Sequence, residues 1–337
     1  MRFSTGGPAM EEAKQVVPML RTGFELQQGA VTDLSEFQTS LPHLFYVTHM
    51  GIADLLPAAW QLTIDGLVQN PLQLCWADLA RYPRERLLAT HECAGSPMRP
   101  TLPVRRVGNV EWEGIPLRCL LEQVGVLPEA QFMWSTGADW GEFNQVTSSS
   151  YQKDLPVSVA QQGRVLLATH VNGQPLTPER GAPLRLVVPD YYGTNSTKWL
   201  LGLSFQERRS SNYYSSQLYN DDVHGSRRPV WGLAPHALMV SHEEGQLLHA
   251  GQHTVWGWAW AKGGVAMVEV SVDGGQSWQP TTLSTRIDFA WQRFAVTLEL
   301  APGAQHWLCR ATATDGQTQP QSGARNEWFG LHVQVIA

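Results

Sequence analysis

Residues 86–103 read R-L-L-A-T-H-E-C-A-G-S-P-M-R-P-T-L-P. The apolar run from Leu87 to Thr90 predicts a short buried strand, and the Gly, Ser and Pro residues that follow predict a loop. Cys93 therefore stands where a strand passes into a loop, a place from which its sulfur can face a cavity. A thiolate is a soft metal ligand and a strong nucleophile. Because cysteine is also among the most often buried residues, a plain core position is the competing interpretation.

The composition is that of a globular protein with about two domains. The chain has 337 residues, of which 43% are hydrophobic and 16% are charged. The net charge of -6 argues against a protein that binds nucleic acid through a basic surface. No apolar run approaches the ~20 residues that a membrane helix needs. The first residues lack an apolar core and a twin arginine, so we expect no export signal and a cytoplasmic protein.

Four cysteines are present, and no two of them form a C-x-x-C pair. This spacing argues against a classical zinc site and against a thioredoxin motif. Cys119 falls inside a predicted helix and is interpreted as structural.

We expect an irregular lead-in over residues 1–40. The segment at 41–51, L-P-H-L-F-Y-V-T-H-M-G, allows two interpretations: an ordinary strand and turn, or a loop that carries His43 and His49 into a site. Farther on, alternation of apolar and polar residues, or continuous apolar runs, predict strands at 60–66, 110–114, 132–135, 166–171 and 183–189. Short helices are predicted at 76–82 and 116–124, the second ending at Gly125.

Three features of this part of the chain suggest chemistry. Tyr151 follows three serines and precedes a helix-like segment. A functional role for this side chain competes with the interpretation that it is a tyrosine exposed on a loop. Arg185 lies inside the apolar strand at 183–189, where a charge is costly unless it meets an anion or a carboxylate. Residues 190–200, D-Y-Y-G-T-N-S-T-K-W-L, offer backbone N–H groups, hydroxyls and Lys198 to a phosphate.

The polar, turn-rich segment at 221–229 predicts a domain boundary. Beyond it, alternating strands are separated by turn signals such as D-G-G-Q at 273–276. Several short strands with regular turns in about a hundred residues are typical of an immunoglobulin-like sandwich.

Four motifs then resemble, in the same order along the chain, the sulfite oxidase family of molybdenum enzymes. They are H-E-C-A-G (91–95), V-E-W-E-G-I-P-L (110–117), N-G-Q-P-L-T-P-E-R-G-A-P-L-R-L-V-V-P (172–189) and Y-Y-G-T-N-S-T-K-W-L (191–200). The segment V-E-V-S-V-D-G-G-Q-S-W (268–278) resembles that family's immunoglobulin-like dimerisation domain. The resemblance begins at about residue 40. It implies an α+β molybdopterin-binding catalytic domain over 41–229 and an all-β immunoglobulin-like dimerisation domain over 230–337.

The resemblance also implies roles for individual residues. Cys93 falls on the position whose thiolate binds molybdenum, and Tyr151 falls on the active-site tyrosine beside the metal. The implied contacts to the molybdenum–molybdopterin cofactor are Tyr46, Val47, Asp139, Arg180, Arg185, Ser196, Thr197 and Lys198. A soft thiolate suits a soft metal, and arginine and lysine suit the phosphate of the pterin.

The activity implied is a two-electron oxygen-atom transfer, most simply the oxidation of sulfite or a related small oxyanion. Electrons would leave one at a time to a separate partner such as a cytochrome, because no C-x-x-C-H haem motif is present. The family's second domain implies a homodimer.

The sequence departs from the family at Thr48, where sulfite oxidases carry an arginine that holds the anionic substrate. Arg99, Arg105 and Arg106 are the nearby replacements. A reductase of an S-oxide or N-oxide is therefore an alternative. Two further alternatives stay open: a cysteine-nucleophile hydrolase that pairs Cys93 with His91 or His49, and a binding protein that has kept the fold and lost the chemistry.

Overall fold

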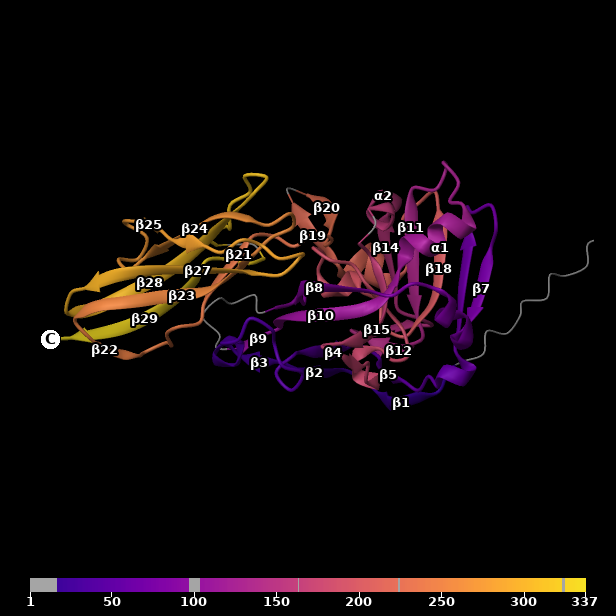
Figure 1. The fold of residues 1–337 in the computed structure, drawn as a ribbon, viewed down its shortest axis with the longest axis horizontal. Coiled ribbons are helices and arrows are strands. Elements are labelled where there is room, and N and C mark those ends of the chain that lie inside the picture. The colour runs from indigo at the N-terminus through magenta and orange to yellow at the C-terminus, as the bar shows by residue number, and fades with distance from the viewer. Residues whose placement is uncertain (1–16, 97–103, 163, 224, 323–324) are drawn as a thin grey trace, which may run out of the picture.

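The computed structural model describes residues 17–96, 104–162, 164–223, 225–322 and 325–337. Strands dominate throughout. The first two thirds of the chain form one end of an elongated molecule, and the last third forms the other end (Figure 1). Within the described ranges, every helix is too short or too polar to cross a membrane.

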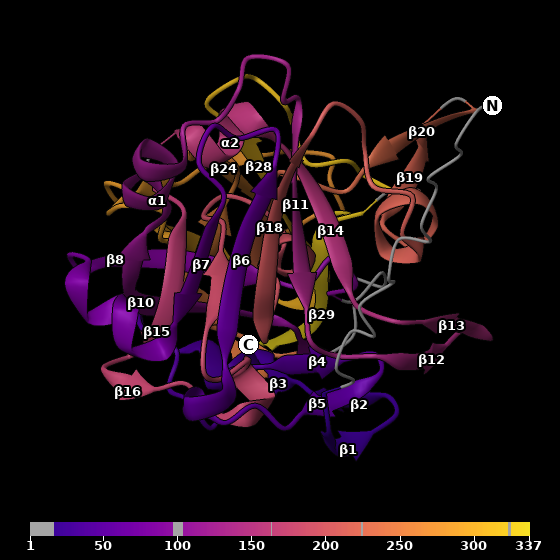
Figure 2. The same ribbon diagram turned by 90° about the vertical axis from the view of Figure 1, so that its right-hand side faces the viewer.

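Two five-stranded sheets build the first part of the molecule. One has the order β16-β15-β10-β8, with β17 pairing β15, and all of its pairs are antiparallel. Its strands are β8 (Glu85–Glu92), β10 (Val107–Pro116), β15 (Leu166–Val171), β16 (Gln174–Pro175) and β17 (Arg185–Val187). The other sheet, β14-β11-β18-β6-β7, lies broadside to the viewer in Figure 2 and contains one parallel pair, β18 with β6. Its strands are β6 (Gln61–Gly66), β7 (Leu72–Cys75), β11 (Phe132–Gly137), β14 (Gln152–Pro156) and β18 (Leu200–Gln206).

Helix α1 (Leu117–Val124) confirms the helix predicted at 116–124. Its buried residues at positions 117, 120, 121 and 124 recur at the three- and four-residue spacing of one helix face, and they join the core that the two sheets share. The helix ends at Gly125, whose φ of 63° is the left-handed conformation that glycine adopts without strain. A second helix, α2 (Val157–Gln161), packs into the same core.

The expectation of an irregular lead-in was wrong for residues 17–40. They contain β1 (Met19–Thr22), β2 (Glu25–Gln27) and β3 (Gly29–Ala30), which pair with β5 (Gly51–Ala53), β4 (Tyr46–Thr48) and β9 (Val104–Arg105). These strands are two to four residues long, so they carry too few residues to show a period of two. Their stability comes from partners that are distant in sequence. Residues 1–16 lie outside the described ranges.

Several other predicted elements change in length or type. The strand before Cys93 extends over all of β8, and the helix predicted at 76–82 is a 3₁₀ helix at Trp76–Arg81. The strand predicted at 183–189 shortens to β17. The helix-like segment expected after Tyr151 is instead strand β14, because its pairing with β11 overrides local propensity, and helix begins only at Val157.

The last third of the chain is all β. One sheet has the order β21-β23-β27-β26 and the other β22-β29-β28-β24-β25. The strands are β21 (His236–Met239), β22 (Leu247–His249), β23 (Gly251–Trp260), β24 (Val265–Ser271), β25 (Gln279–Pro280), β26 (Thr282–Leu283), β27 (Gln292–Leu300), β28 (Gly303–Ala313) and β29 (Phe329–Ile336). Residues of both sheets share one apolar core. The strands expected from alternation in this region are therefore present.

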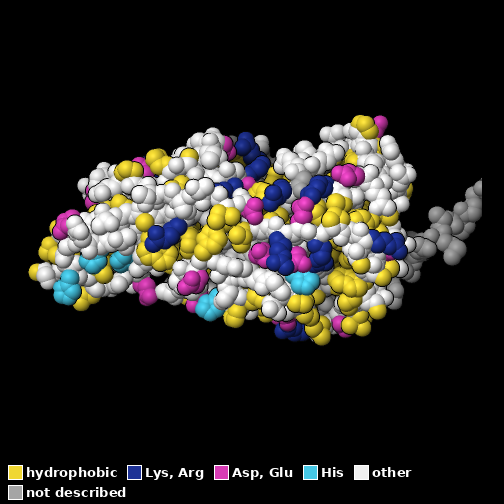
Figure 3. Space-filling model, viewed as in Figure 1, with side chains coloured by type: hydrophobic (Ala, Val, Ile, Leu, Met, Phe, Trp, Pro, Cys, Tyr) yellow, Lys and Arg dark blue, Asp and Glu magenta, His cyan; other side chains and the backbone are white. Residues whose placement is uncertain are grey.

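The two parts of the molecule are packed together. Ala94 and Val107, next to the loop that carries Cys93, belong to the same apolar cluster as the core of the last third. The polar segment at 221–229 forms most of a hairpin, β19 (Asn220–Val223) with β20 (Ser226–Pro229). On the face shown in Figure 3, acidic and basic side chains are interspersed. That pattern does not resemble a nucleic-acid footprint.

Candidate active site

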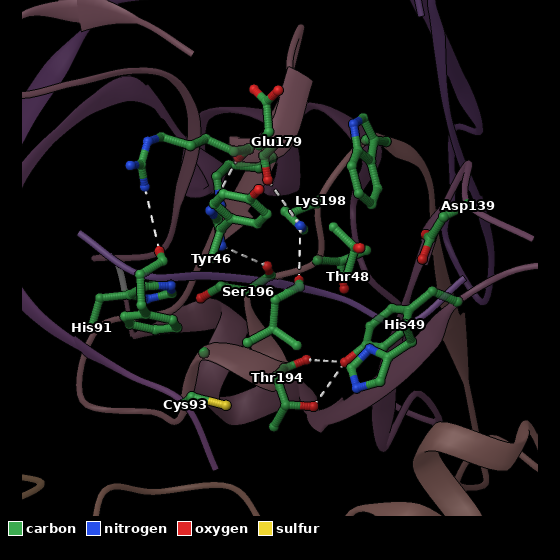
Figure 4. Close-up of a pocket in the computed structure, with 18 of the residues that line it drawn as sticks. Tyr46, Thr48, His49, His91, Cys93, Asp139, Glu179, Thr194, Ser196 and Lys198 are labelled. Atoms are coloured by element: carbon green, nitrogen blue, oxygen red, sulfur yellow. Dashed lines mark hydrogen bonds between the residues drawn. The ribbon is translucent and has the colours of Figure 1, made fainter. Parts of the chain in front are cut away.

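A cavity with about 710 Å³ of empty space, including its open mouth, lies in the first part of the molecule. All ten residues to which the family resemblance assigned a catalytic or cofactor-binding role line it: Tyr46, Val47, Cys93, Asp139, Tyr151, Arg180, Arg185, Ser196, Thr197 and Lys198. In Figure 4, Cys93 and Thr194 lie at one end of the view and Glu179 and Lys198 toward the other. We call these the thiol end and the cationic end.

Cys93 forms part of the thiol end. It comes directly after β8, and its backbone N–H donates to the Arg106 carbonyl at 2.9 Å. Burial raises the pKa of the Cys93 thiol, whereas the Gly95 N–H at 3.4 Å and the side chain of Arg106 act in the opposite direction. Cys93 is thus a partly exposed residue whose sulfur accepts one hydrogen bond, from the Gly95 N–H, and this bond and the nearby charge of Arg106 favour the thiolate form.

Tyr151 lies across the thiol end and is buried, which excludes the exposed-loop interpretation. Its hydroxyl donates to the Thr194 carbonyl at 2.6 Å and lies 2.7 Å from Thr194 Oγ1. Thr194 belongs to the 3₁₀ turn Gly193–Asn195 within the loop at 190–200. Burial raises the pKa of Tyr151, so the hydroxyl keeps its proton at physiological pH.

Two buried arginines form part of the cationic end. Arg180 donates to the carbonyls of Leu41, Leu44 and Phe45, at 2.7 to 3.4 Å. Arg185 donates to the carbonyls of Arg180 and Ser196, at 3.1 and 3.0 Å, and stacks on the ring of Trp112. Burial, with the charge of Arg180 adding to it, lowers the pKa of Arg185 to about 9.

Lys198 is the third cation at this end. Its ammonium donates to the carbonyls of Val47 and Glu179, at 3.0 and 2.9 Å (Figure 4). Burial lowers the pKa of Lys198, and the neighbouring Arg185 lowers it further. Burial raises the pKa of Asp139, and the charge of Lys198 opposes that rise.

These residues fit an anionic cofactor. Among the described residues, none of the three cations forms an ion pair with a carboxylate, and the Nε of Arg185 has no hydrogen-bond partner. Buried cations that bond only to main-chain carbonyls are costly unless an anion joins them. In the same ranges, no group of three or more His, Cys, Asp or Glu residues could hold a metal by itself. A metal bound through Cys93 would therefore need further ligands from a cofactor.

The two histidines of segment 41–51 lie in different environments. His49 lines the cavity, whereas His43 is exposed and pairs with Asp33 at 3.1 Å. Burial and the charge of Lys198 lower the pKa of His49 to about 3, which keeps it neutral.

The arginines proposed to replace the family's substrate arginine also differ in where they lie. Arg105 was a wrong choice: it does not line the cavity, and its guanidinium lies over the ring of Phe329. Arg106 lies beside Cys93, whereas Arg99 is outside the described residues.

Sequence reasoning missed two polar residues of the thiol end. The sequence assigns no individual role to Thr194 within the loop at 190–200, because its contacts with Tyr151 depend on a 3₁₀ turn that its neighbours do not signal. Tyr219 lines the cavity from a segment 68 residues after Tyr151, and no motif marks it.

Two family models match the chain. The "oxidoreductase molybdopterin binding domain" covers residues 49–214, and the "Mo-co oxidoreductase dimerisation domain" covers residues 228–333. The chain belongs to the sulfite oxidase family of molybdopterin enzymes. The first match includes most of the residues that line the cavity. The lining residues outside it are those at positions 44–48, which include β4, and Tyr219.

Named sulfite oxidases are among the similar proteins. The mitochondrial sulfite oxidase of Mus musculus is 28% identical, over 88% of this chain and 62% of the mouse protein. The sulfite oxidase of Arabidopsis thaliana is 28% identical, over 83% of this chain and 81% of the plant protein. The chain thus spans less than two thirds of the length of its mouse relative.

A solved structure shares the fold. The sulfane dehydrogenase SoxCD of Paracoccus pantotrophus superimposes with a TM-score of 0.78, covering 99% of this chain and 96% of that chain, at 24% sequence identity. At this identity the likeness shows the arrangement of both parts of the molecule and not the substrate.

Proposed function

We propose that this member of the sulfite oxidase family is a molybdenum-dependent oxidoreductase that transfers an oxygen atom. The substrate would be sulfite or a related small oxyanion, and the electrons would pass to an external acceptor such as a cytochrome. One observation carries the proposal. A single cavity combines the Cys93 thiol and the Tyr151 hydroxyl at one end with three cations that lack carboxylate partners at the other.

Each residue has a distinct task in this proposal. The molybdenum–molybdopterin cofactor supplies the two-electron oxygen-transfer chemistry. Cys93 holds the metal through its thiolate, and Arg185 and Lys198 hold the phosphate through charge-assisted hydrogen bonds. Tyr46, Val47, Asp139, Arg180, Ser196 and Thr197 complete the walls that orient the pterin.

Tyr151 is placed to donate a hydrogen bond to the oxygen atom that is transferred. It carries a single proton, which it now gives to the Thr194 carbonyl at 2.6 Å. A rotation about the C–O bond of the phenol redirects that proton into the cavity without moving the ring. Because the ring stays in place, this donor stabilises developing negative charge at the cost of exchanging one hydrogen bond for another.

A second candidate function, reduction of an S-oxide or N-oxide, is favoured by the surroundings of Thr48. Thr48 lines the cavity where an arginine would hold a dianion, and its hydroxyl accepts from the Glu25 N–H at 3.2 Å. The neighbouring His49 is neutral. This wall carries no fixed charge, which suits a neutral substrate as well as an anion.

The geometry does not favour a cysteine hydrolase. Among the described residues, Cys93 forms no hydrogen bond to His91 or His49. His91 is stacked on Phe45, and burial lowers its pKa, so it is a poorly placed base.

We further propose the division into a catalytic domain over 41–229 and an immunoglobulin-like domain over 230–337 that forms a homodimer. The two facing sheets of the last third and the match to a dimerisation-domain model support this division. Light scattering of the purified protein tests the dimer. A cytoplasmic location stays a prediction.

The function is tested by metal analysis and turnover on one preparation. Protein purified from a host that makes molybdopterin should contain about one molybdenum per chain and reduce a dye when sulfite is added. Molybdenum without sulfite turnover, together with S-oxide-dependent oxidation of a reduced dye, would favour the second candidate. Fully active protein free of molybdenum would refute both.

A further inference from the structure

A short segment of the last third, residues 286–290, reaches across to the first part of the molecule. It is a closed turn: the Ala290 N–H donates to the Ile287 carbonyl at 2.9 Å, and the Ala290 carbonyl accepts from Arg286 Nε at 3.3 Å. We call it the bridging turn. It lies just before β27 and contacts two parts of the active site that are far apart in the sequence.

The first contact is with β8, the strand that ends one residue before Cys93. β8 is the last strand of its sheet, so one of its edges would otherwise leave N–H and C=O groups unpaired. Phe289 pairs with that edge: its N–H donates to the Leu88 carbonyl at 2.9 Å, and its carbonyl accepts from the Thr90 N–H at 3.0 Å. The Asp288 carboxylate accepts from the Leu88 N–H at 3.3 Å. The bridging turn thus holds the strand that leads to the thiol.

The second contact is with Asp190, the first residue of the loop at 190–200. The Arg286 guanidinium pairs with the Asp190 carboxylate through two of its nitrogens, one of them 3.4 Å from Oδ2. The Gly263 N–H donates to the same carboxylate at 2.9 Å. The two paired side chains are largely buried, with 17% and 11% of their surfaces exposed. A guanidinium paired in this way fixes the orientation of a carboxylate as well as its position.

The loop that begins at Asp190 forms part of both ends of the cavity. The Thr194 carbonyl accepts a hydrogen bond from the Tyr151 hydroxyl at 2.6 Å, and Lys198 belongs to the cationic end. Asp190 has a φ of 66°, a left-handed conformation that is uncommon for residues other than glycine. The surrounding contacts therefore have to stabilise the backbone at the point where the loop starts.

We infer that Arg286 is a positioning residue for the active site. Its side chain ties the start of the loop at 190–200 to the turn that pairs with β8, and so fixes Thr194 and Lys198 relative to Cys93. A displacement of about 1 Å in a site can cost about 100-fold in rate, so such a tie has a large effect on turnover. The effect on turnover rests on the proposed function, whereas the tie between the loop and the strand does not.

A double-mutant cycle tests this role. Arg286→Gln removes the charge that faces Asp190, and turnover per bound molybdenum should fall by about tenfold, less than the cost of a full 1 Å displacement. In an Asp190→Gly background the same substitution should change turnover less than about twofold, because the carboxylate through which Arg286 acts is gone. Glycine is chosen because it adopts a positive φ without strain. Equal losses in both backgrounds, or no loss in the wild-type background, would overturn the inference.

The matched control is Arg310→Gln. Arg310 pairs with Glu269 at 2.8 Å inside the last third and lies over the ring of Trp278, much as Arg286 lies over the ring of Phe289. This variant should keep the wild-type turnover per bound molybdenum. A loss as large as that of Arg286→Gln would show that any weakening of the last third lowers turnover, which would refute a specific role.

A second measurement needs no turnover. Hydrogen exchange of the full chain without cofactor, followed by mass spectrometry, reports how readily each segment opens. In Arg286→Gln we expect faster exchange at residues 88–90 and 191–198, and exchange in β28 as slow as in the wild-type protein. Asp190→Gly cuts the same ion pair from the other side and should show the same pattern.

Unchanged exchange at either of the two segments would overturn the inference, because the tie would then not hold both. Faster exchange in β28 as well would indicate a general loss of stability and would also overturn it. Absence of molybdenum from the purified protein would refute the proposed function and leave this measurement intact.

Discussion

The carboxylate of Glu92 accepts a hydrogen bond from Trp260 Nε1 at 2.9 Å, across 168 residues of sequence. Glu92 is 0% exposed, and its other oxygen lies 3.3 Å from His236 Nδ1. It immediately precedes Cys93. The last third of the chain therefore anchors the end of the strand that presents the sulfur to the cavity.

Trp260→Phe should destabilise the protein by about 1–3 kcal/mol, because it removes a donor from a buried carboxylate. Thermal unfolding of the full chain measures the effect. Trp134→Phe is the control, since the Trp134 Nε1 donates to the Arg208 carbonyl at an exposed site. Similar losses of stability in the two variants would show that the hydrogen bond from Trp260 to the buried carboxylate stabilises the protein no more than an exposed hydrogen bond does.

Cys93→Ser should abolish turnover while leaving much of the fold and part of the cofactor in place. Substituting a residue that only supports a metal ligand lowers metal affinity or activity by about 10- to 100-fold. Loss of the thiolate ligand itself should therefore lower turnover by more than about 100-fold. In the proposed function Arg185 and Lys198 would still hold the phosphate. Circular dichroism and pterin fluorescence measured beside turnover check the prediction, and turnover near the wild-type level would remove Cys93 from the metal site.

Tyr151→Phe should lower turnover by about 10²- to 10³-fold, which is the usual cost of removing one preorganised donor. Molybdenum content should stay the same, because the hydroxyl bonds to Thr194 and not to the cationic end. Metal analysis and steady-state kinetics on the same sample separate the two effects. Parallel loss of metal and turnover would instead make Tyr151 a cofactor-binding residue.

The sequence predicted the local features that depend on short-range chemistry. The helix before Gly125 shows a clear period, and the strand at 166–171 has the predicted limits. The hairpin after that strand follows from Asn172 and Gly173, whose positive φ angles of 49° and 72° suit a two-residue turn. Arg185 was expected to meet an anion or a carboxylate. Among the described residues its guanidinium meets no carboxylate and instead donates to carbonyls and stacks on Trp112, so of the two expected partners the anion remains a prediction.

Features that depend on long-range pairing escaped prediction. β2 is three residues long and forms only because β4 lies beside it. Tyr219 reaches the thiol end from beyond the catalytic motifs, and its partner His49 lies 170 positions earlier. Such contacts leave no periodic trace in the sequence, because each involves single residues whose partners are set by the fold.

The affinity of the cofactor-free protein for an anion should fall as pH rises from mildly acidic values through about 7, a range that lies below the pKa of about 9 of Arg185. Burial lowers the pKa of Lys198 from 10.5 to about 7, so this amine loses its proton within that range. Burial raises the pKa of Asp139 from 3.8, so its ionisation at rising pH adds a negative charge nearby. Both titrations weaken anion binding in the same direction.

Isothermal titration with sulfate, whose charge is constant over this range, measures the effect. Loss of one charge-assisted hydrogen bond is worth about 1.5–3 kcal/mol, so affinity should fall at least about tenfold. Lys198→Arg is the matched control, because a guanidinium stays charged throughout. Its affinity should vary much less with pH, and the remainder should disappear when Asp139→Asn is added. An unchanged pH dependence in Lys198→Arg would show that another group titrates, and the cationic end would then owe its anion affinity to the two arginines alone.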